Sequence, residues 1–98
     1  MNRDHIIATL KARQTDLRRM GVVSLSLFGS VAREEAGAES DIDLLALYDH
    51  DAHLSLIDVV HIENFLQNLF GKSVQLVSEP IKRAAVRERV EAERVNVF

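Results

Sequence analysis

Apolar residues recur at helical spacing in three stretches of the chain. The first two cover residues 4–20 and 54–70. A third helix is expected at 79–94, with Pro80 in its first turn, where the missing N–H of proline does no harm. The charged residues of this last helix are expected to form a solvated face. The apolar residues at the chain end leave a partner-binding surface as the alternative.

The helix at 54–70 carries the clearest signals at its two ends. Ser55 and Asp58 form a Ser-x-x-Asp start, and Gly71 follows the last apolar residue, as is typical of a left-handed helix end. The residues expected on the buried side of this helix are Leu54, Ile57, Val60, His61, Phe65, Leu66, Leu69 and Phe70. In the first helix, Asp4 is expected to act as the cap.

Alternation of apolar and polar residues predicts strands at 22–28 and 41–47, and a shorter third strand is expected at 73–78. In the first strand, Val23 is expected to lie on the same face as Leu25. The order of these elements predicts an α/β (α+β) fold, in which about four helices pack on a small mixed β-sheet of three or more strands.

Length and composition exclude several classes of protein. A chain of 98 residues is expected to form a single domain over residues 1–98, and 47% apolar with 28% charged residues is ordinary for a globular fold. The absence of cysteine excludes a disulfide scaffold, a thiolate metal site and a cysteine nucleophile. No stretch approaches the roughly 18 apolar residues of a membrane helix, and the start of the chain does not resemble a signal peptide. We therefore expect a cytoplasmic protein without a membrane partner.

The formal net charge of −3 gives no general attraction to nucleic acid, so direct nucleic-acid binding is not expected. The polar connection at 48–53 contains His50 and His53 together with two aspartates. These residues have metal-ligating groups, but a cluster of this kind in a loop is more often a solvated turn.

The residues with candidate chemistry lie at the end of the first strand and the start of the second. Gly29 ends the first strand, and Ser30 is expected to cap a short helix whose free N–H groups can meet a phosphate. Asp41 and Asp43 are two positions apart, so on a strand both carboxylates leave the same face, about 6–7 Å apart along the backbone. Each feature alone is common on protein surfaces. Together they indicate a site for a metal-bound nucleoside triphosphate.

The run Phe28-Gly29-Ser30, followed by Asp41-Ile42-Asp43-Leu44, resembles the signature of the DNA polymerase β-like nucleotidyltransferase superfamily. The longer run from Phe28 to Leu45 is similar to the minimal nucleotidyltransferases (MNT), which include the MntA-like antitoxins of HEPN/MNT toxin–antitoxin pairs. This resemblance implies the polymerase β-like nucleotidyltransferase fold. It also implies transfer of AMP from ATP, or of another nucleotide, to a tyrosine hydroxyl of a HEPN-domain toxin.

The same resemblance implies roles for individual residues. Asp41 and Asp43 would hold two Mg²⁺ ions, roughly 3.5–4 Å apart in such sites, around the triphosphate. Gly29 and Ser30 would hold the terminal phosphates, and Arg33 could add a charge-assisted contact.

The chain departs from the family pattern in the third strand. Where the family has an aspartate that completes the metal site, this chain has Gln75 in the run Val74-Gln75-Leu76-Val77. The amide of Gln75 offers a carbonyl oxygen to a metal, but it brings no negative charge and cannot accept a proton. Nucleotide binding is therefore expected to be retained and transfer to be weakened.

Two interpretations follow from Gln75. The first is a working nucleotidyltransferase antitoxin, which the intact Gly29-Ser30 and the pair Asp41 and Asp43 favour. The second is a weakened or inactive member that neutralises its partner by binding, which Gln75 favours. A nucleic-acid polymerase or tRNA-modifying enzyme is not favoured, because 98 residues leave no room for a nucleic-acid-binding domain.

Overall fold

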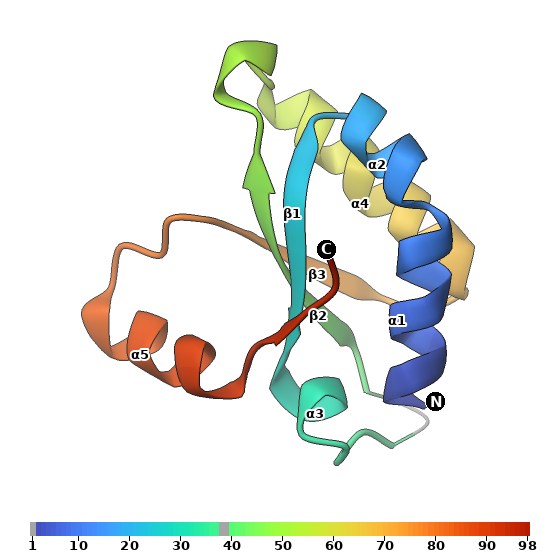
Figure 1. Ribbon diagram of the computed structural model, residues 1–98, viewed down its shortest axis with the longest axis vertical. Coiled ribbons are helices and arrows are strands. Elements are labelled where there is room, and N and C mark those ends of the chain that lie inside the picture. Colours follow the sequence, from blue (N-terminus) through green and yellow to red (C-terminus); the bar gives the residue numbers. More distant parts are fainter. Residues whose placement is uncertain (1, 38–39) are drawn as a thin grey trace.

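The computed structural model describes residues 2–37 and 40–98 and has a mixed α/β architecture, as expected (Figure 1). Helices α1, α2 and α4 lie along one side of a four-stranded sheet, and α5 lies on the opposite side in this view. The elements are α1 (Arg3–Ala12), α2 (Gln14–Arg19), β1 (Val22–Phe28), α3 (Gly29–Ala32), β2 (Ile42–Tyr48), the 3₁₀-helix η1 (His50–Ala52), α4 (Leu56–Phe70), β3 (Val74–Ser78), α5 (Ala84–Glu93) and β4 (Val95–Asn96).

The strand order is β3-β2-β1-β4, so β2 and β1 form the centre of the sheet. β2 runs parallel to β3, and β1 runs antiparallel to both β2 and β4. Alternate residues of the strands form the main core with residues of α1, α2 and α4. The members of this core with 0% exposure are Ile6, Leu10, Leu17, Leu25, Leu27, Ile42, Leu44, Ala46 and Leu66. No helix in the described part of the chain is long and apolar enough to cross a membrane.

The region expected to be one helix at 4–20 is two helices, so this prediction was wrong in its continuity. The break falls at Arg13, whose N–H bonds to Leu10 O at 3.0 Å in a tightened last turn. No residue between Leu10 and Leu17 is buried, so packing does not require a continuous helix there. Asn2 is the cap instead of Asp4, because its side chain accepts hydrogen bonds from the N–H groups at the start of α1.

Helix α4 has the ends that the sequence predicts, and its second half buries the expected side, where Leu66 is fully buried and Phe65 and Phe70 pack against the core. Its first half buries a different side. Ser55 and Asp58 form a capping box, and Gly71 ends the helix with φ 63°. The fully buried residue of its first half is Ile62, whereas Ile57 is 67% exposed. The expected packing residue His61 is also exposed. Apolar residues occur on several sides of this segment, so the spacing alone did not decide which side meets the sheet.

Strand β1 has the expected bounds, but Val23 does not lie on the buried side. The pairing with β2 shifts between Val22 and Ser24, where one residue is left out of the register. Val22 is therefore buried and Val23 is 45% exposed. From Leu25 onward the expected alternation holds.

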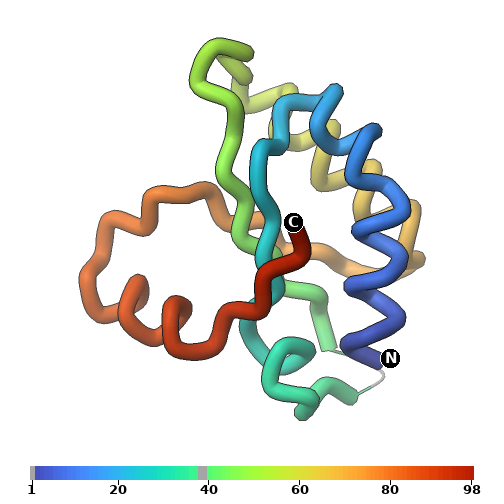
Figure 2. The backbone as a smooth tube through the Cα atoms, in the orientation of Figure 1, coloured from blue at the N-terminus to red at the C-terminus, as the bar shows by residue number. Residues whose placement is uncertain are grey.

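The last part of the chain differs most from expectation. Glu79 N bonds to Ala46 O at 2.8 Å, so sheet pairing continues past β3 and α5 begins only at Ala84, which leaves Pro80 outside the helix. The end of the chain then returns to β1 (Figure 2) and adds the unpredicted strand β4. Val97 is buried in the main core, so the apolar chain end is chiefly a packing element.

We predict that truncations at two isoleucines of α4 separate its buried and exposed sides. Ile62→Ala should lower the free energy of unfolding by about 2–5 kcal/mol, because it opens a cavity in the core. Ile57→Ala makes the same chemical change on the exposed side and should alter the free energy by less than about 0.5 kcal/mol. Urea unfolding followed by circular dichroism measures both. A larger loss for Ile57→Ala would mean that α4 packs as the sequence pattern predicted.

Candidate functional site

The site is built on Asp43, near the start of β2. The strand register pairs Asp43 with Phe28 of β1 on one side and with Gln75 of β3 on the other. Neighbouring strands lie about 4.8 Å apart, and paired residues point to the same face. Ile42 and Leu44, on either side of Asp43, are fully buried in the main core. Asp43 and Gln75 therefore leave the opposite face of the sheet together.

Gly29 places the turn after β1 directly against the Asp43 carboxylate. Its φ is 74°, a conformation that residues with a side chain rarely adopt. A Cβ atom at this position would overlap Asp43 Oδ2 and lie 3.1 Å from Asp43 Cγ. Glycine thus satisfies two requirements here, backbone conformation and space, and the first turn of α3 can lie beside the carboxylate.

Ser30 is the second residue of α3, not its cap, so this prediction was wrong. Phe28 occupies the cap position, and within the described residues no side chain caps the helix. The Ser30 carbonyl accepts the N–H of Glu35 at 2.9 Å, and Gly29 O accepts the N–H of Arg33 at 3.1 Å. The serine is half-buried at the same end of the sheet as Asp43.

The two aspartates differ in exposure. Asp41 precedes β2 and is exposed, whereas Asp43 is half-buried. Burial raises the pKa of the Asp43 carboxyl, and the negative charge of Asp41 raises this pKa further. The positive charge of Arg33 opposes both effects on the pKa. The charges of Asp41 and Arg33 therefore act on the Asp43 carboxyl in opposite directions.

The residues present fit a hard divalent cation. Carboxylate and amide oxygens are ligands that Mg²⁺ accepts, and Mg²⁺ commonly keeps several of its waters. Asp41 and Asp43 would supply the carboxylates, and Gln75 would supply an amide oxygen. In the described residues there is no group of three or more His, Cys, Asp and Glu side chains able to hold a metal. Among the described residues, therefore, no third side chain of these types joins Asp41 and Asp43.

Arg33 directly follows α3, and carboxylates on two sides hold its guanidinium. Nε donates to Glu35 and Nη1 donates to Glu93, each at 3.0 Å. The hydrogen bond to Glu35 is the main cause of a raised Arg33 pKa, so this side chain stays positively charged. Sequence analysis missed Glu93, because 60 positions separate it from Arg33 and no motif connects them.

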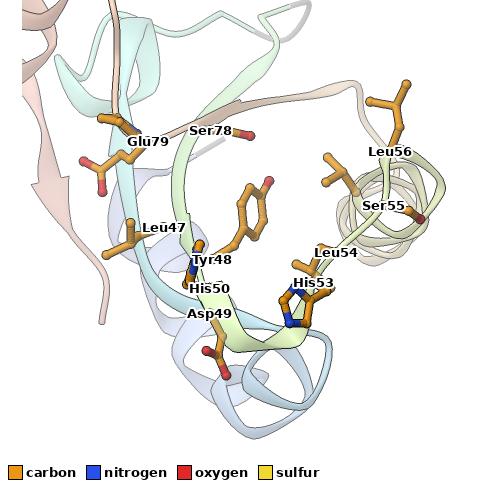
Figure 3. A pocket seen from close by; sticks show the side chains of 12 residues that line it. Leu47, Tyr48, Asp49, His50, His53, Leu54, Ser55, Leu56, Ser78 and Glu79 are labelled. Carbon is orange, nitrogen blue, oxygen red and sulfur yellow. The ribbon is translucent and has the colours of Figure 1, made fainter.

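The polar connection at 48–53, which contains His50 and His53, forms part of a separate cavity at the other end of β2. This cavity of about 620 Å³ is lined by Tyr48, His50, His53 and the start of α4, and Figure 3 shows the two histidines and Tyr48 around it. The imidazole rings of His50 and His53 are 6.4 Å apart. None of the predicted site residues lines this cavity.

Comparisons with known proteins agree with this fold. Residues 8–97 match the family described as the nucleotidyltransferase domain. Protein adenylyltransferase MntA of Thermococcus cleftensis is 34% identical over 95 residues, which cover 96% of this chain and 94% of the relative.

Solved structures give the same result. One described as a minimal nucleotidyltransferase is 34% identical and has a TM-score of 0.81. The match covers 97% of this chain and 95% of that structure's chain. A crystal structure of a toxin–antitoxin with AMP-PNP has a TM-score of 0.72 over 100% of this chain and 73% of its own. At 21% identity, that likeness shows the fold alone.

We predict that Gly29→Ala destabilises the protein through its contact with Asp43. The free energy of unfolding should fall by about 2 kcal/mol or more, because both the positive φ and the overlap disfavour the methyl group. An Asp43→Ala background removes Oδ2 and Cγ, so the loss should shrink to the cost of the positive φ, about 1–2 kcal/mol, plus that of the tight contact with the remaining Cβ at 3.2 Å. A double-mutant cycle in urea measures the difference. Equal losses in the two backgrounds would show that Gly29 and the carboxylate do not meet.

We also predict a pH-dependent stabilisation in the Asp43→Asn variant. A raised pKa means that folded Asp43 binds its proton more tightly than the unfolded chain does. Wild-type stability should therefore fall as the pH rises from about 3.9, the ordinary aspartate value, through the raised pKa. Asp43→Asn should gain in melting temperature over the wild type across this window. Below it, the two proteins should converge.

The measurement is a series of thermal melts in a metal chelator. Asp51→Asn removes the same charge from the exposed η1 segment and serves as the control for net charge. A difference between Asp43→Asn and the wild type that is constant with pH would contradict the raised pKa.

Proposed function

We propose that this chain, which belongs to the nucleotidyltransferase domain family, transfers AMP from ATP to a tyrosine hydroxyl of a partner HEPN toxin and thereby acts as the antitoxin. One observation carries the proposal. The strand register brings the Asp43 carboxylate, the Gly29 turn and Gln75 to one end of the sheet. The name of the 34% identical relative, protein adenylyltransferase MntA, supports the choice of reaction. We expect the transfer to take place in the cytoplasm.

The proposed roles follow from charge and position. Gly29 and Ser30 would bind the terminal phosphates through the start of α3, and Arg33 would add a positive charge. Asp41 and Asp43 would hold Mg²⁺, which supplies Lewis-acid chemistry at the phosphate oxygens when bound. In the transfer, the acceptor oxygen bonds to the α-phosphorus, the hydroxyl proton passes to solvent water, and pyrophosphate leaves with the electrons of the broken P–O bond.

Gln75 limits the step in which the acceptor hydroxyl loses its proton. Its amide cannot accept that proton, and it stands in register with Asp43, where a carboxylate could have done so. A positioned general base contributes about 10²–10⁴ in rate. We therefore propose a slow transferase, in which binding of the nucleotide is less affected than activation of the acceptor.

The same residue supports a second candidate function. If transfer is lost, the protein would neutralise its toxin by binding alone. The shortage of a third carboxylate beside Asp43 favours this alternative, and the pair Asp41 and Asp43 favours the enzyme. A neighbouring gene for a HEPN protein with a tyrosine-bearing tail would support modification.

We predict that the purified chain, given Mg²⁺ and α-labelled ATP, labels a co-purified toxin slowly. Asp43→Asn should abolish the label, because one of the two metal-binding carboxylates is gone. Gln75→Asp should accelerate labelling by up to about 10²–10⁴-fold, because it restores a proton acceptor. Asp51→Asn and Asn68→Asp make matching charge changes at exposed positions away from the site, and they should label like the wild type.

The pattern of labelling separates the candidates. Label in the wild type that is lost in Asp43→Asn supports the transferase. Label only in Gln75→Asp supports an antitoxin that acts by binding. With the toxin present, no label in the wild type or in Gln75→Asp would contradict the proposed transfer.

A further inference from the structure

An ion pair joins the candidate site to the far end of the chain. Glu93, the last residue of α5, accepts from Arg33 Nη1 at 3.0 Å. The Glu93 side chain is 23% exposed, whereas Glu35, the other carboxylate on Arg33, is 65% exposed. Glu93 is thus the better-shielded of the two anchors, and screening by solvent weakens its attraction less.

The backbone that carries Glu93 is itself held to the sheet. The next residue, Arg94, donates from Nη2 to Ser26 Oγ at 2.8 Å, and Ser26 is the fully buried polar residue of β1. Arg94 Nη1 also donates to Glu79 and to Glu91, each at 2.7 Å. Beyond Arg94 the chain pairs with β1 as β4. The end of α5 therefore has a defined position relative to the strand that leads into Gly29.

We infer that Glu93 is a positioning residue, which holds the Arg33 guanidinium at the end of α3, one turn beyond the Gly29 contact with Asp43, before a nucleotide arrives. This inference rests on the proposed function. Glu35 occupies Nε and Glu93 occupies Nη1, and within residues 2–37 and 40–98 Nη2 has no hydrogen-bond partner. A guanidinium held in this way keeps Nη2 for a phosphate oxygen.

The benefit is one of preorganisation. A free arginine side chain has several rotatable bonds, and a ligand that must order it loses affinity. The ion pair to Glu93 orders Arg33 in advance. The direction of the Asp43 pKa shift caused by Arg33 agrees with this placement, because a nearby positive charge lowers the pKa of a carboxyl.

The test compares nucleotide affinity in matched variants. Binding of AMP-PNP with Mg²⁺ is measured by calorimetry for the wild type, Arg33→Ala, Glu93→Gln and the double variant. Glu88→Gln is the control, because it removes the same charge from an exposed position of the same helix. Urea unfolding of each variant reports whether the fold is intact.

The expected result is a graded loss of affinity. Arg33→Ala should weaken binding most, and Glu93→Gln should weaken it about two- to fivefold, in line with the strength of a partly exposed ion pair. Glu88→Gln should bind like the wild type. In the Arg33→Ala background, Glu93→Gln should add no further loss, because its effect passes through Arg33.

Other outcomes overturn distinct statements. If Arg33→Ala weakens binding and Glu93→Gln does not, the positioning role is wrong and the proposed function stands. Tighter binding in Glu93→Gln would also overturn it, because Glu93 would then compete with the phosphate. An equal loss from Glu93→Gln in both backgrounds would mean a general structural effect. No nucleotide binding by the folded wild type would overturn both the inference and the proposed function.

Discussion

Hydrogen bonds between β2 and its two neighbours keep Asp43 in register with Phe28 and Gln75. Because strand residues alternate between faces, a slip of one position would turn the carboxylate toward the helices and bring Leu44 out of the core. Core packing therefore protects the site as well as the fold. Gly29 directly follows Phe28, so the same register also sets the first turn of α3 against the carboxylate.

The second constraint lies at the end of the chain. Ser26 is fully buried in β1, and its hydroxyl is satisfied by Arg94 at the end of α5. A buried polar group without a partner is costly, so this contact favours one position for the end of the helix. Glu93 directly precedes Arg94, so its backbone is held in place as well. Its ion pair then holds the Arg33 guanidinium relative to the sheet. Two elements far apart in sequence thus meet at the candidate site.

Features with a local physical cause were predictable. The capping box joins Ser55 and Asp58, which are only three positions apart, and the bounds of β1 follow from alternation along the strand itself. Features that depend on competition between surfaces were not. Apolar residues around α4 offered more than one side to the core, and only contact with the sheet selected Ile62 over Ile57.

The sequence by itself determined the order of most elements and the family. The family follows from the spacing between Gly-Ser and the paired aspartates, which can be read along the chain without any knowledge of packing. It also identified Gln75 as a departure, since that depends on residue type alone. The tertiary structure decided that Gln75 pairs with Asp43 and that Glu93 meets Arg33. Those contacts join residues far apart in the chain, and their positions follow from strand register and helix packing, which local sequence does not encode.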